Sequence, residues 1–491
     1  MNEQGITYGA LAAIVFLVQT IVPSNGQTRT PFMSLGVLSA PTPSPFADSN
    51  GLMPPNYHGP LFKLSHDYPA ALSTLPGELP WRKAIGGGPI TVENAGAYAS
   101  ALKDYVAADM RLMLTESSSW DAARLGWYSE PWTGFLREAT HGAYVGSSPF
   151  PAGLFNGSGL TKPFTTYVLT FYDKRAGNVL YNIWGKDATK PTITTDATQF
   201  GEGAVVVKAA FSSANADVWP VMQGAQQWTV YISTNATKHP QPSPTPQLDQ
   251  VSFFQFDIIV KDTQSAPATG WVFTTLVYDK DASGDFWDKM VPLGAMWGND
   301  PQINSETSPN EPLTQTWINP RAPAYSKMTL GWGGRLSGPN DGAVNDAVID
   351  GPVPLVAPNL PSSSCMSCHS VAEWPMKSFL LPTATDPQAF PPQGFTNSDY
   401  LVMWPPGSTQ GPSPDNTAAW THWFQSRPGT VPADTGTVAF DYDMVATFKS
   451  LIAWAAATAS AGGAPASIEA ARRTTVPLIG GSYNGRNFRP N

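Results

Sequence analysis

The two cysteines of this 491-residue chain lie three residues apart, at Cys365 and Cys368, and His369 follows directly. No disulfide can therefore connect distant parts of the chain, so the fold must be held together by buried apolar side chains. A disulfide between the two cysteines themselves would close a short, strained loop. We therefore expect both thiols to serve one shared ligand.

The order Cys-x-x-Cys-His is the attachment pattern of a c-type haem. Each thiol adds to one of two vinyl groups on the same edge of the porphyrin, and two intervening residues let the chain span that edge. The histidine that follows is placed to bind the iron as its proximal ligand. The motif predicts one haem c, attached covalently through Cys365 and Cys368, with His369 as an iron ligand.

Two other uses of paired cysteines fit the sequence less well. A thioredoxin-like Cys-x-x-Cys belongs to the start of a helix in a βαβ unit. The segment before the motif predicts no such unit because it contains Pro352, Pro354, Pro358 and Pro361. A closed structural zinc site needs four ligands, and the chain has no third cysteine.

The first 26 residues resemble an export signal. Residues 6–22 form an apolar run, and Ser24 and Gly26 provide small side chains at the −3 and −1 positions of a cleavage site. Residues 1–4 lack the usual positive charge, and the run is close to the lower length limit for a membrane-spanning helix. We expect residues 1–26 to be a cleaved signal, or alternatively a membrane anchor, and the rest to be periplasmic or otherwise exported.

The composition agrees with a large, loop-rich exported protein. Apolar residues make up 42% of the chain, whereas charged residues make up only 13%, and there are 48 prolines and 43 glycines. The net charge of −9 disfavours binding to nucleic acid or anionic lipid. An acidic surface suits a basic redox partner protein, and membrane contact is expected only through the N-terminal segment.

Apolar and polar residues alternate with the period of β-strands in the middle of the chain. Strands are predicted at residues 167–172, 179–184, 204–211, 228–232, 252–260 and 271–278. The first two flank a turn at residues 174–178 and predict a hairpin. Six strands without intervening helices predict an antiparallel β-sandwich or a jelly-roll-like domain.

Two amphipathic helices are predicted outside this β region. The first, at residues 91–114, has an apolar stripe of Tyr98, Leu102, Tyr105, Val106, Met110 and Met113. The second, at residues 441–457, has an apolar face of Met444, Phe448, Leu451, Ile452 and Ala455. Both faces are expected to pack in a core.

The predicted organisation is a multidomain α+β chain. The segments after the signal are a Pro/Ser-rich extended segment (27–90), a helical and aromatic segment (91–150), the antiparallel β domain (151–300), a connecting segment (301–351) and a mostly helical, loop-rich c-type cytochrome domain (352–491).

Several landmarks, taken with the haem motif, resemble the large single-haem c-type cytochromes of bacteria. They lie at residues 271–278, 296–301, 317–320, 331–339 and 440–442. In that group a long β-rich N-terminal part precedes one Cys-x-x-Cys-His region, and most members have no assigned activity. The resemblance implies haem binding and electron transfer, although the segment 340–349 is longer than the spacer expected before the motif.

An electron-transfer haem usually has a second axial ligand, Met or His. Met403 is the preferred candidate because it lies in an extended stretch bounded by prolines. His422 is the main alternative, whereas Met444 is better explained by helix packing and Met376 follows the motif too closely to reach the opposite face. An open or water-bound iron also fits the sequence.

Three functions are compatible with these patterns, and electron transfer is favoured because no other catalytic constellation is recognisable. The first is an exported electron-transfer cytochrome; Arg335 and Arg427 are candidates to pair with its haem propionates, although unpaired surface charge explains them equally well. The second is a peroxidase- or oxygenase-like haem enzyme with an open distal site. His141, with Arg137 and Glu138, would be its acid–base group, although a structural loop explains the same residues. The third is a sugar- or polymer-binding β domain with a redox appendage.

Overall fold

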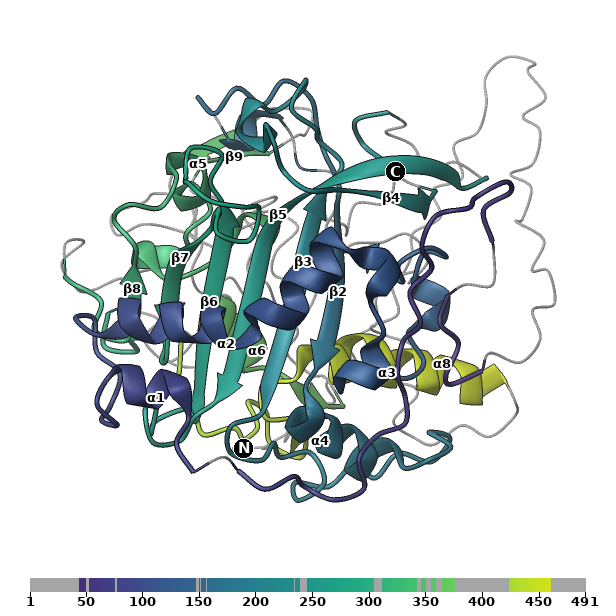
Figure 1. Ribbon diagram of the computed structural model, residues 1–491. Coiled ribbons are helices and arrows are strands. Elements are labelled where there is room, and N and C mark those ends of the chain that lie inside the picture. The colour runs from purple at the N-terminus through teal and green to yellow at the C-terminus, as the bar shows by residue number, and fades with distance from the viewer. Residues whose placement is uncertain are drawn as a thin grey trace, which may run out of the picture.

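The fold is centred on one antiparallel sheet of eight strands, ordered β1-β2-β3-β5-β6-β7-β8, with β4 also paired to β5 (Figure 1). The computed structural model describes residues 44–49, 53–75, 77–146, 150, 152–155, 157–233, 235–238, 245–303, 311–341, 346–349, 355–358, 364–375 and 424–460. The antiparallel α+β class predicted from the sequence is confirmed.

The strands of the central sheet are β1 (Tyr144–Val145), β2 (Thr166–Tyr172), β3 (Val205–Ser212), β4 (Gln227–Ile232), β5 (Gln247–Lys261), β6 (Trp271–Tyr278), β7 (Met290–Met296) and β8 (Thr316–Ile318). Two further antiparallel pairs are β9 (Asp346–Ile349) with β10 (Leu355–Pro358), and β11 (Glu373–Trp374) with β12 (Val438–Ala439).

The α-helices are α1 (Pro80–Ala84), α2 (Ala95–Thr115), α3 (Ala122–Leu125), α4 (Lys174–Trp184), α5 (Ala324–Lys327), α6 (Cys365–His369) and α8 (Leu451–Ser460). A π-helical turn, η8 (Ala446–Ser450), leads into α8. The 3-10 turns are η1 (Ser117–Ser119), η2 (Gly134–Leu136), η3 (Ala152–Phe155), η4 (Pro220–Met222), η5 (Trp332–Gly334) and η6 (Pro339–Asp341).

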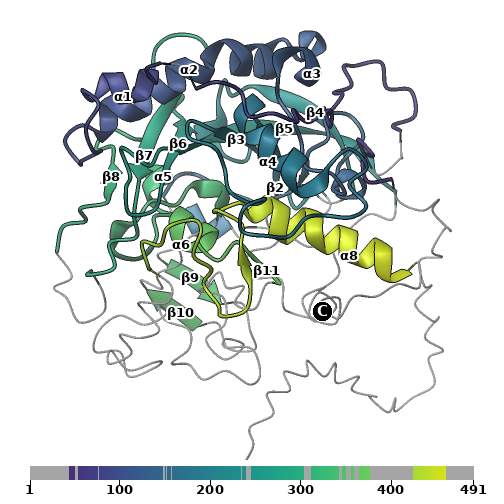
Figure 2. The same cartoon turned by 90° about the horizontal axis from the view of Figure 1, so that it is seen from below.

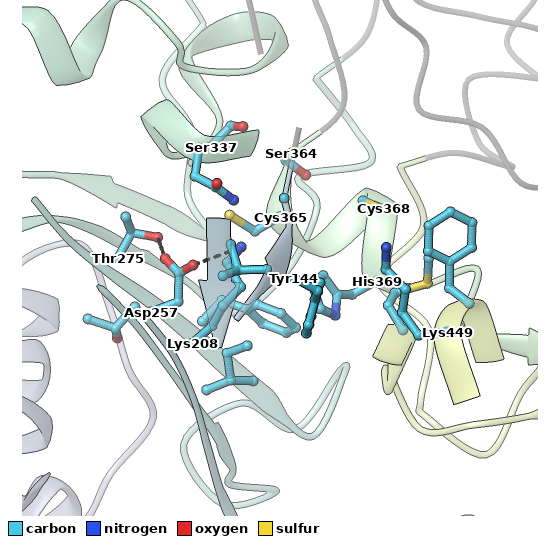
Figure 3. A pocket seen from close by; sticks show the side chains of 18 of the residues that line it. Tyr144, Lys208, Asp257, Thr275, Ser337, Ser364, Cys365, Cys368, His369 and Lys449 are labelled. Atoms are coloured by element: carbon cyan, nitrogen blue, oxygen red, sulfur yellow. Dashed lines mark hydrogen bonds and ion pairs between the residues drawn. The ribbon is translucent and has the colours of Figure 1, made fainter. Parts of the chain in front are cut away.

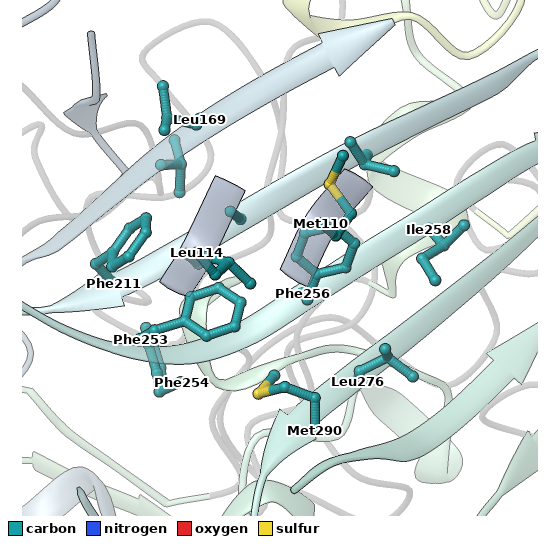
Figure 4. Packing of buried hydrophobic residues seen from close by; sticks show 14 of the residues in the cluster. Met110, Leu114, Leu169, Phe211, Phe253, Phe254, Phe256, Ile258, Leu276 and Met290 are labelled. Carbon is teal, nitrogen blue, oxygen red and sulfur yellow. The ribbon is translucent and has the colours of Figure 1, made fainter. Parts of the chain in front are cut away.

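Helix α2 covers one face of the sheet (Figure 4). Its buried side chains pack with side chains of β3, β5 and β6 and with the start of β7; this cluster includes Met110, Leu114, Phe211, Phe253, Phe256, Ile258, Leu276 and Met290. The helix predicted at residues 91–114 is confirmed. Tyr105 does not belong to its buried stripe: it is 45% exposed, and its ring meets the edge of Trp81 at a centroid distance of 5.0 Å.

Helices α4, α6 and α8 share a second core with the opposite face of the sheet. Figure 2 shows α6 and α8 on the side of the sheet away from α2. The sheet contributes Tyr172, Val206, Trp271, Phe273, Val277, Leu293 and Met296 to this core. The described parts of the segment 352–491 therefore complete the core of the β region.

The predicted hairpin is wrong at its second strand, because residues 179–184 belong to helix α4. Asp173 starts this helix: its carboxylate accepts hydrogen bonds from the backbone N–H of Arg175 (3.0 Å) and Ala176 (2.7 Å). The apolar residues that resembled a strand recur at helical spacing and are buried; they are Ala176, Val179, Leu180, Ile183 and Trp184. The residues expected to form the hairpin turn are the first turn of this helix.

The predicted sandwich is not observed, because the long strands in the described part of the chain belong to one sheet. Helices rather than a second sheet complete both cores. The sheet also extends beyond the predicted limits 151–300, through β1 and β8. Strand β7 escapes prediction because Pro292 and Gly294 disfavour a strand interior. A register shift opposite Thr275 and Leu276 accommodates them.

The predicted C-terminal helix is confirmed, with all five residues of its apolar face buried. Its first two predicted residues, Asp441 and Tyr442, form a turn instead. In the described residues no helix is both long and apolar enough to cross a membrane. The predicted signal or anchor at residues 1–26 lies outside the described residues.

Candidate haem-attachment site

The Cys-x-x-Cys-His motif forms the short helix α6, which a reciprocal capping box fixes at its start. The Ser364 Oγ accepts a hydrogen bond from the backbone N–H of Ser367 (3.1 Å), and the Ser367 Oγ accepts one from the backbone N–H of Ser364 (2.8 Å). Ser364 Oγ also lies 3.1 Å from Asn299 Oδ1, and the Cys365 N–H donates to the carbonyl oxygen of Leu336 (2.9 Å). The motif is thereby anchored to the loops that follow β7 and β8.

A cavity lies between α6 and the sheet, and Cys365, Cys368 and His369 all border it (Figure 3). Its volume is about 160 Å³, or about 960 Å³ when the space open to solvent is included. The other walls come from β1, β2, β3, β5, β6 and η8. The three residues predicted from the motif are therefore brought to one cavity.

The imidazole of His369 is held in a defined orientation. Its Nδ1 lies 2.8 Å from the carbonyl oxygen of Tyr442. Because a carbonyl oxygen can only accept, Nδ1 carries a proton, and in the neutral form of the ring the lone pair is then on Nε2. Phe273 packs edge-on against the ring at a centroid distance of 4.9 Å. Such a hydrogen bond fixes the tautomer and raises the basicity of an imidazole that binds a metal.

The Tyr442 carbonyl belongs to a turn with an unusual backbone. Asp441 and Tyr442 both have positive φ values, 44° and 70°, which is strained for residues other than glycine. The Asp441 carboxylate holds the turn: it accepts hydrogen bonds from Lys261 Nζ and Trp271 Nε1, both at 2.7 Å, and from the backbone N–H of Phe200 at 2.8 Å. The strain is therefore compensated by contacts with the end of β5 and the start of β6.

A row of polar side chains crosses the sheet side of the cavity (Figure 3). Lys208 on β3, Asp257 on β5 and Thr275 on β6 are cross-strand neighbours. Asp257 pairs with Lys208 Nζ at 3.0 Å and accepts hydrogen bonds from Thr275 Oγ1 (2.7 Å) and Gln255 Nε2 (2.9 Å). Asp257 is buried and Lys208 is half-buried, and charged residues are rarely buried without a partner.

Lys449 enters the same cavity from the π-helical turn η8. Its Nζ lies 5.1 Å from the ring centroid of Tyr144 and 5.6 Å from that of Phe448. Burial among these groups lowers the pKa of the lysine to about 7. π-Helical turns occur frequently at functional sites, and here the turn directs a lysine side chain into the cavity that Cys365, Cys368 and His369 border.

The sequence offers four side chains as candidate distal ligands of the iron. Met403, Met376 and His422 lie outside the described residues. Met444 lies within them: it is buried in the second core and borders the cavity. Its packing agrees with the role expected from the sequence.

The two arginines predicted to bind propionates stabilise the fold through hydrogen bonds to backbone carbonyl oxygens. Arg335 is fully buried and donates to the backbone carbonyl oxygens of Asn299, Asp300 and Ile303 at 2.7–2.8 Å. Arg427 donates to the carbonyl oxygen of Ser370 at 2.7 Å. Neither side chain borders the cavity.

The acid–base group predicted around His141 for a haem enzyme has a structural role instead. The His141 ring stacks on Trp228 at a centroid distance of 4.4 Å, in the core below α2 rather than at the cavity. Glu138 accepts hydrogen bonds from the backbone N–H of Thr140, His141 and Ala143. Burial lowers the pKa of His141 to about 4. These residues therefore hold a loop together.

The aromatic side chains that suggested polymer binding are also in the cores. The tryptophans of the β region are Trp184, Trp219, Trp228, Trp271, Trp287 and Trp297, each at most 6% exposed. In the described residues nothing about them favours a sugar or polymer site.

The donor set fits a c-type haem. Two thiols separated by one helical turn and an imidazole whose Nδ1 proton is already bonded match the ligands that the group needs. The cavity of about 160 Å³ is smaller than the about 300–1,000 Å³ usual for small-molecule sites, so the described walls would enclose only part of a porphyrin. No group of three or more metal-binding side chains occurs in the described part of the chain.

No family model, no curated protein and no solved structure matches this chain. The site must therefore be interpreted from its own geometry.

The sequence interpretation did not single out Lys208, Asp257 or Lys449. The two strand residues come together through the register of β3 and β5, which a pattern of alternation does not specify. Lys449 resembles an ordinary polar residue of an amphipathic helix. The signal that identifies it is structural, namely a lysine that a π-helical turn directs into a cavity.

Proposed function

We propose that the protein is an exported electron-transfer cytochrome with one haem c attached through Cys365 and Cys368. The observation that carries the proposal is the hydrogen bond from His369 Nδ1 to the Tyr442 carbonyl oxygen, within a cavity that both thiols border. A histidine that serves only packing does not require this orientation beside two thiols.

The bound haem would supply one-electron iron chemistry, and the chain would position it. The capping box of Ser364 and Ser367 fixes the helix that carries the thiols. The Tyr442 carbonyl accepts the Nδ1 proton, so Nε2 would be the atom that binds the iron. Phe273, on β6, packs edge-on against the imidazole.

The wider proposal assigns residues 352–491 to the cytochrome domain and the β region to its support. The apolar run at residues 6–22 supports export, because haem c is attached outside the cytoplasm. The net charge of −9 supports a basic redox partner protein.

A haem enzyme is the second candidate, and one observation favours it. The ion pair of Lys208, which is half-buried, with Asp257, which is buried, lies on the sheet side of the cavity. Charged groups in a cofactor cavity are typical of catalytic sites, whereas a simple electron carrier does not require them.

Haem attachment is tested by replacing both cysteines, as Cys365→Ser with Cys368→Ser. Covalent haem stain on a denaturing gel should disappear, while each single variant should keep a reduced stain because one thioether bond remains. Stain that survives in the double variant would contradict the attachment site.

The carrier and the enzyme are distinguished by the optical and EPR spectra of the purified protein. A carrier should have a low-spin ferric iron, and Met403→Ala should convert it to high spin if Met403 is the distal ligand. A high-spin iron in the wild type that binds cyanide readily would favour the enzyme instead.

A further inference from the structure

Two carboxyl groups meet just after the haem motif, outside the cavity. Glu373 begins strand β11, four residues after His369, and a side-chain hydrogen bond joins its carboxyl group to that of Asp434 in the loop before β12. Glu373 is 1% exposed, whereas Asp434 is half-buried. The pair is therefore largely removed from water but keeps contact with solvent through Asp434.

The hydrogen bonds of Glu373 leave one of its oxygens for a proton. Its Oε2 accepts from the backbone N–H of Asp434 (3.0 Å) and from Thr437 Oγ1 (2.9 Å). Glu373 Oε1 and Asp434 Oδ2 are buried and have no donor in the described residues. Because two ionised carboxylates cannot hydrogen-bond to each other, a proton on Glu373 Oε1 satisfies both oxygens. Burial, with the Asp434 carboxyl group beside it, raises the pKa of Glu373 to about 7.

Arg427 connects this pair to the residues that hold the imidazole. The charges of the two carboxyl groups act on its guanidinium group, which donates to the carbonyl oxygen of Ser370, the residue after His369 (2.7 Å). The carbonyl oxygen of Arg427 accepts a hydrogen bond from Tyr442 Oη (2.8 Å), and the Tyr442 carbonyl oxygen accepts the Nδ1 proton of His369. A change of charge at the pair therefore acts on the surroundings of His369 from close by.

Other charged and titratable groups in the described residues pack around the pair. They are Arg427 from the segment before β12, His369 from α6, Tyr442 from the turn after β12, and the ion pair of Asp441 in that turn with Lys261 of β5. Burial raises the pKa of Tyr442, so its side chain stays neutral. Among the pKa values that burial shifts in this cluster, that of Glu373 lies near neutral pH.

We propose that Glu373, paired with Asp434, binds a proton whose uptake accompanies reduction of the haem. The proposal rests on the function proposed above and specifies how pH regulates that site. An electron delivered by the redox partner protein adds negative charge next to His369, and up to one proton then moves from solvent to Glu373 Oε1, where an O–H bond forms and donates to Asp434 Oδ2. Oxidation returns the electron to a partner protein and the proton to solvent. Proton affinity and electron affinity are coupled reciprocally.

Glu373→Gln tests the proposal because the side-chain amide has the shape of the protonated acid. The amide can donate to Asp434 Oδ2 and accept from Thr437, but it does not ionise, so the fold should persist; circular dichroism and thermal melting verify this. The matched control is Glu116→Gln, at an exposed residue. Asp434→Asn is the second variant, since its amide replaces a negative charge and stabilises the ionised form of Glu373.

The first measurement is the reduction potential of the purified protein with its haem, from about pH 5 to about pH 9. The wild-type potential should fall through neutral pH, because the oxidised protein loses the proton at lower pH than the reduced protein. The total change should be about tenfold in the ratio of reduced to oxidised protein, as is usual for partly buried charges roughly 10 Å apart, which is 59 mV for one electron. Glu373→Gln should keep the potential near its acid value, Asp434→Asn should move the fall to lower pH, and Glu116→Gln should change nothing.

The second measurement is infrared difference spectroscopy on redox cycling at neutral pH. Reduction of the wild type should produce the carbonyl band of a protonated carboxylic acid, and this band should be absent from Glu373→Gln and present in Glu116→Gln. A purely structural role of Glu373 produces no such band. Lys449, whose pKa is also about 7, is present in every variant and has no carboxyl group, so it does not affect the comparison.

The two proposals fail in different ways. Absence of covalent haem in the wild type overturns both. Covalent haem with the same dependence of potential on pH in the wild type and in Glu373→Gln overturns the proton site alone, and so does the lack of a carboxylic acid band that Glu373→Gln removes.

Discussion

Lys261 Nζ lies 2.7 Å from Asp441 Oδ1, which joins the end of β5 to the strained turn before the C-terminal helix. The Asp441 side chain is fully buried, and only 11% of the Lys261 side chain is exposed. Removal of one partner would leave the other as a buried unpaired charge. The pair therefore couples the stability of the sheet to the position of the Tyr442 carbonyl.

We predict that Asp441→Ala lowers the free energy of unfolding by about 3–5 kcal/mol, as is usual when one partner of a buried ion pair is removed. Urea denaturation measures this. The matched control is Asp281→Ala, whose partner Lys280 is on the surface and whose side chain is 78% exposed; it should cost less than about 1 kcal/mol. Equal costs for the two variants would show that Asp441 has no special role.

The capping box predicts a local effect at the haem motif. Ser364→Ala should destabilise the protein by about 1 kcal/mol, because the N–H of Ser367 loses its acceptor. It should also reduce covalent haem loading, since the helix that carries the thiols frays. Asp121→Ala removes the cap of α3 and should leave haem loading unchanged. A loss of loading in both variants would point to a general folding defect.

A pair of buried carboxyl groups predicts a dependence of stability on pH. Glu130 accepts a hydrogen bond from Trp184 Nε1 (3.0 Å), and Asp443 accepts one from Tyr172 Oη (2.9 Å). Their remaining oxygens, Glu130 Oε1 and Asp443 Oδ2, are buried and have no donor in the described residues. A proton shared between them satisfies both. Burial raises the pKa of Asp443 to about 6 and that of Glu130 well above its usual value.

Because these folded-state pKa values lie above the unfolded ones, the folded protein binds more protons, and stability falls as pH rises. The contribution is complete below about pH 4 and is lost as pH passes through the folded pKa, about 6 for Asp443. Glu130→Gln can donate to Asp443 without ionising. We predict that it flattens the loss between pH 4 and 8 and gains on the order of 1–2 kcal/mol at pH 8.

Denaturation of both proteins across this range measures the difference. Other groups with shifted pKa values, such as Glu373, His66 and His141, cancel in the comparison because both proteins contain them. Parallel pH profiles for the wild type and Glu130→Gln would rule out the shared proton.

A conservative substitution can decide whether Met444 only packs in the core or binds the iron. If it only packs, Met444→Leu should cost less than about 1.5 kcal/mol, because the volume is nearly conserved, and the haem spectrum should not change. Conversion of the iron to high spin in this variant, but not in Met403→Ala, would identify Met444 as the distal ligand.

The sequence predicted correctly those parts of the fold where the spacing of apolar residues fits a single type of secondary structure. Strands β2, β3, β5 and β6 and helix α2 follow from clear periodicity. The run Val179–Trp184 has two explanations, because a short apolar segment suits a strand or a buried helix; the cap at Asp173 decides for the helix. Pro292 and Gly294 conceal β7, since a bulge that tolerates them depends on the neighbouring strand.

The candidate site likewise contains residues that the sequence predicts and residues that it does not. The residues of the motif are contiguous in the chain, so their spacing alone predicts their shared function. Lys208 and Asp257 meet only through strand pairing, and Arg335 is occupied by carbonyl oxygens that lie over 30 residues earlier in the chain. Contacts of this kind depend on the tertiary structure, which a local pattern does not contain.

The sheet packs against a core on each of its faces, and the chain completes these two cores at different stages of its synthesis. Synthesis completes the sheet at Ile318, and by then α2 already covers one face. The other face, with Val206, Phe273 and Val277, stays partly bare until α6 and α8 arrive. A chain that has been synthesised only as far as β8 therefore exposes an apolar surface, and the later helices α6, which carries Cys365 and Cys368, and α8 cover it.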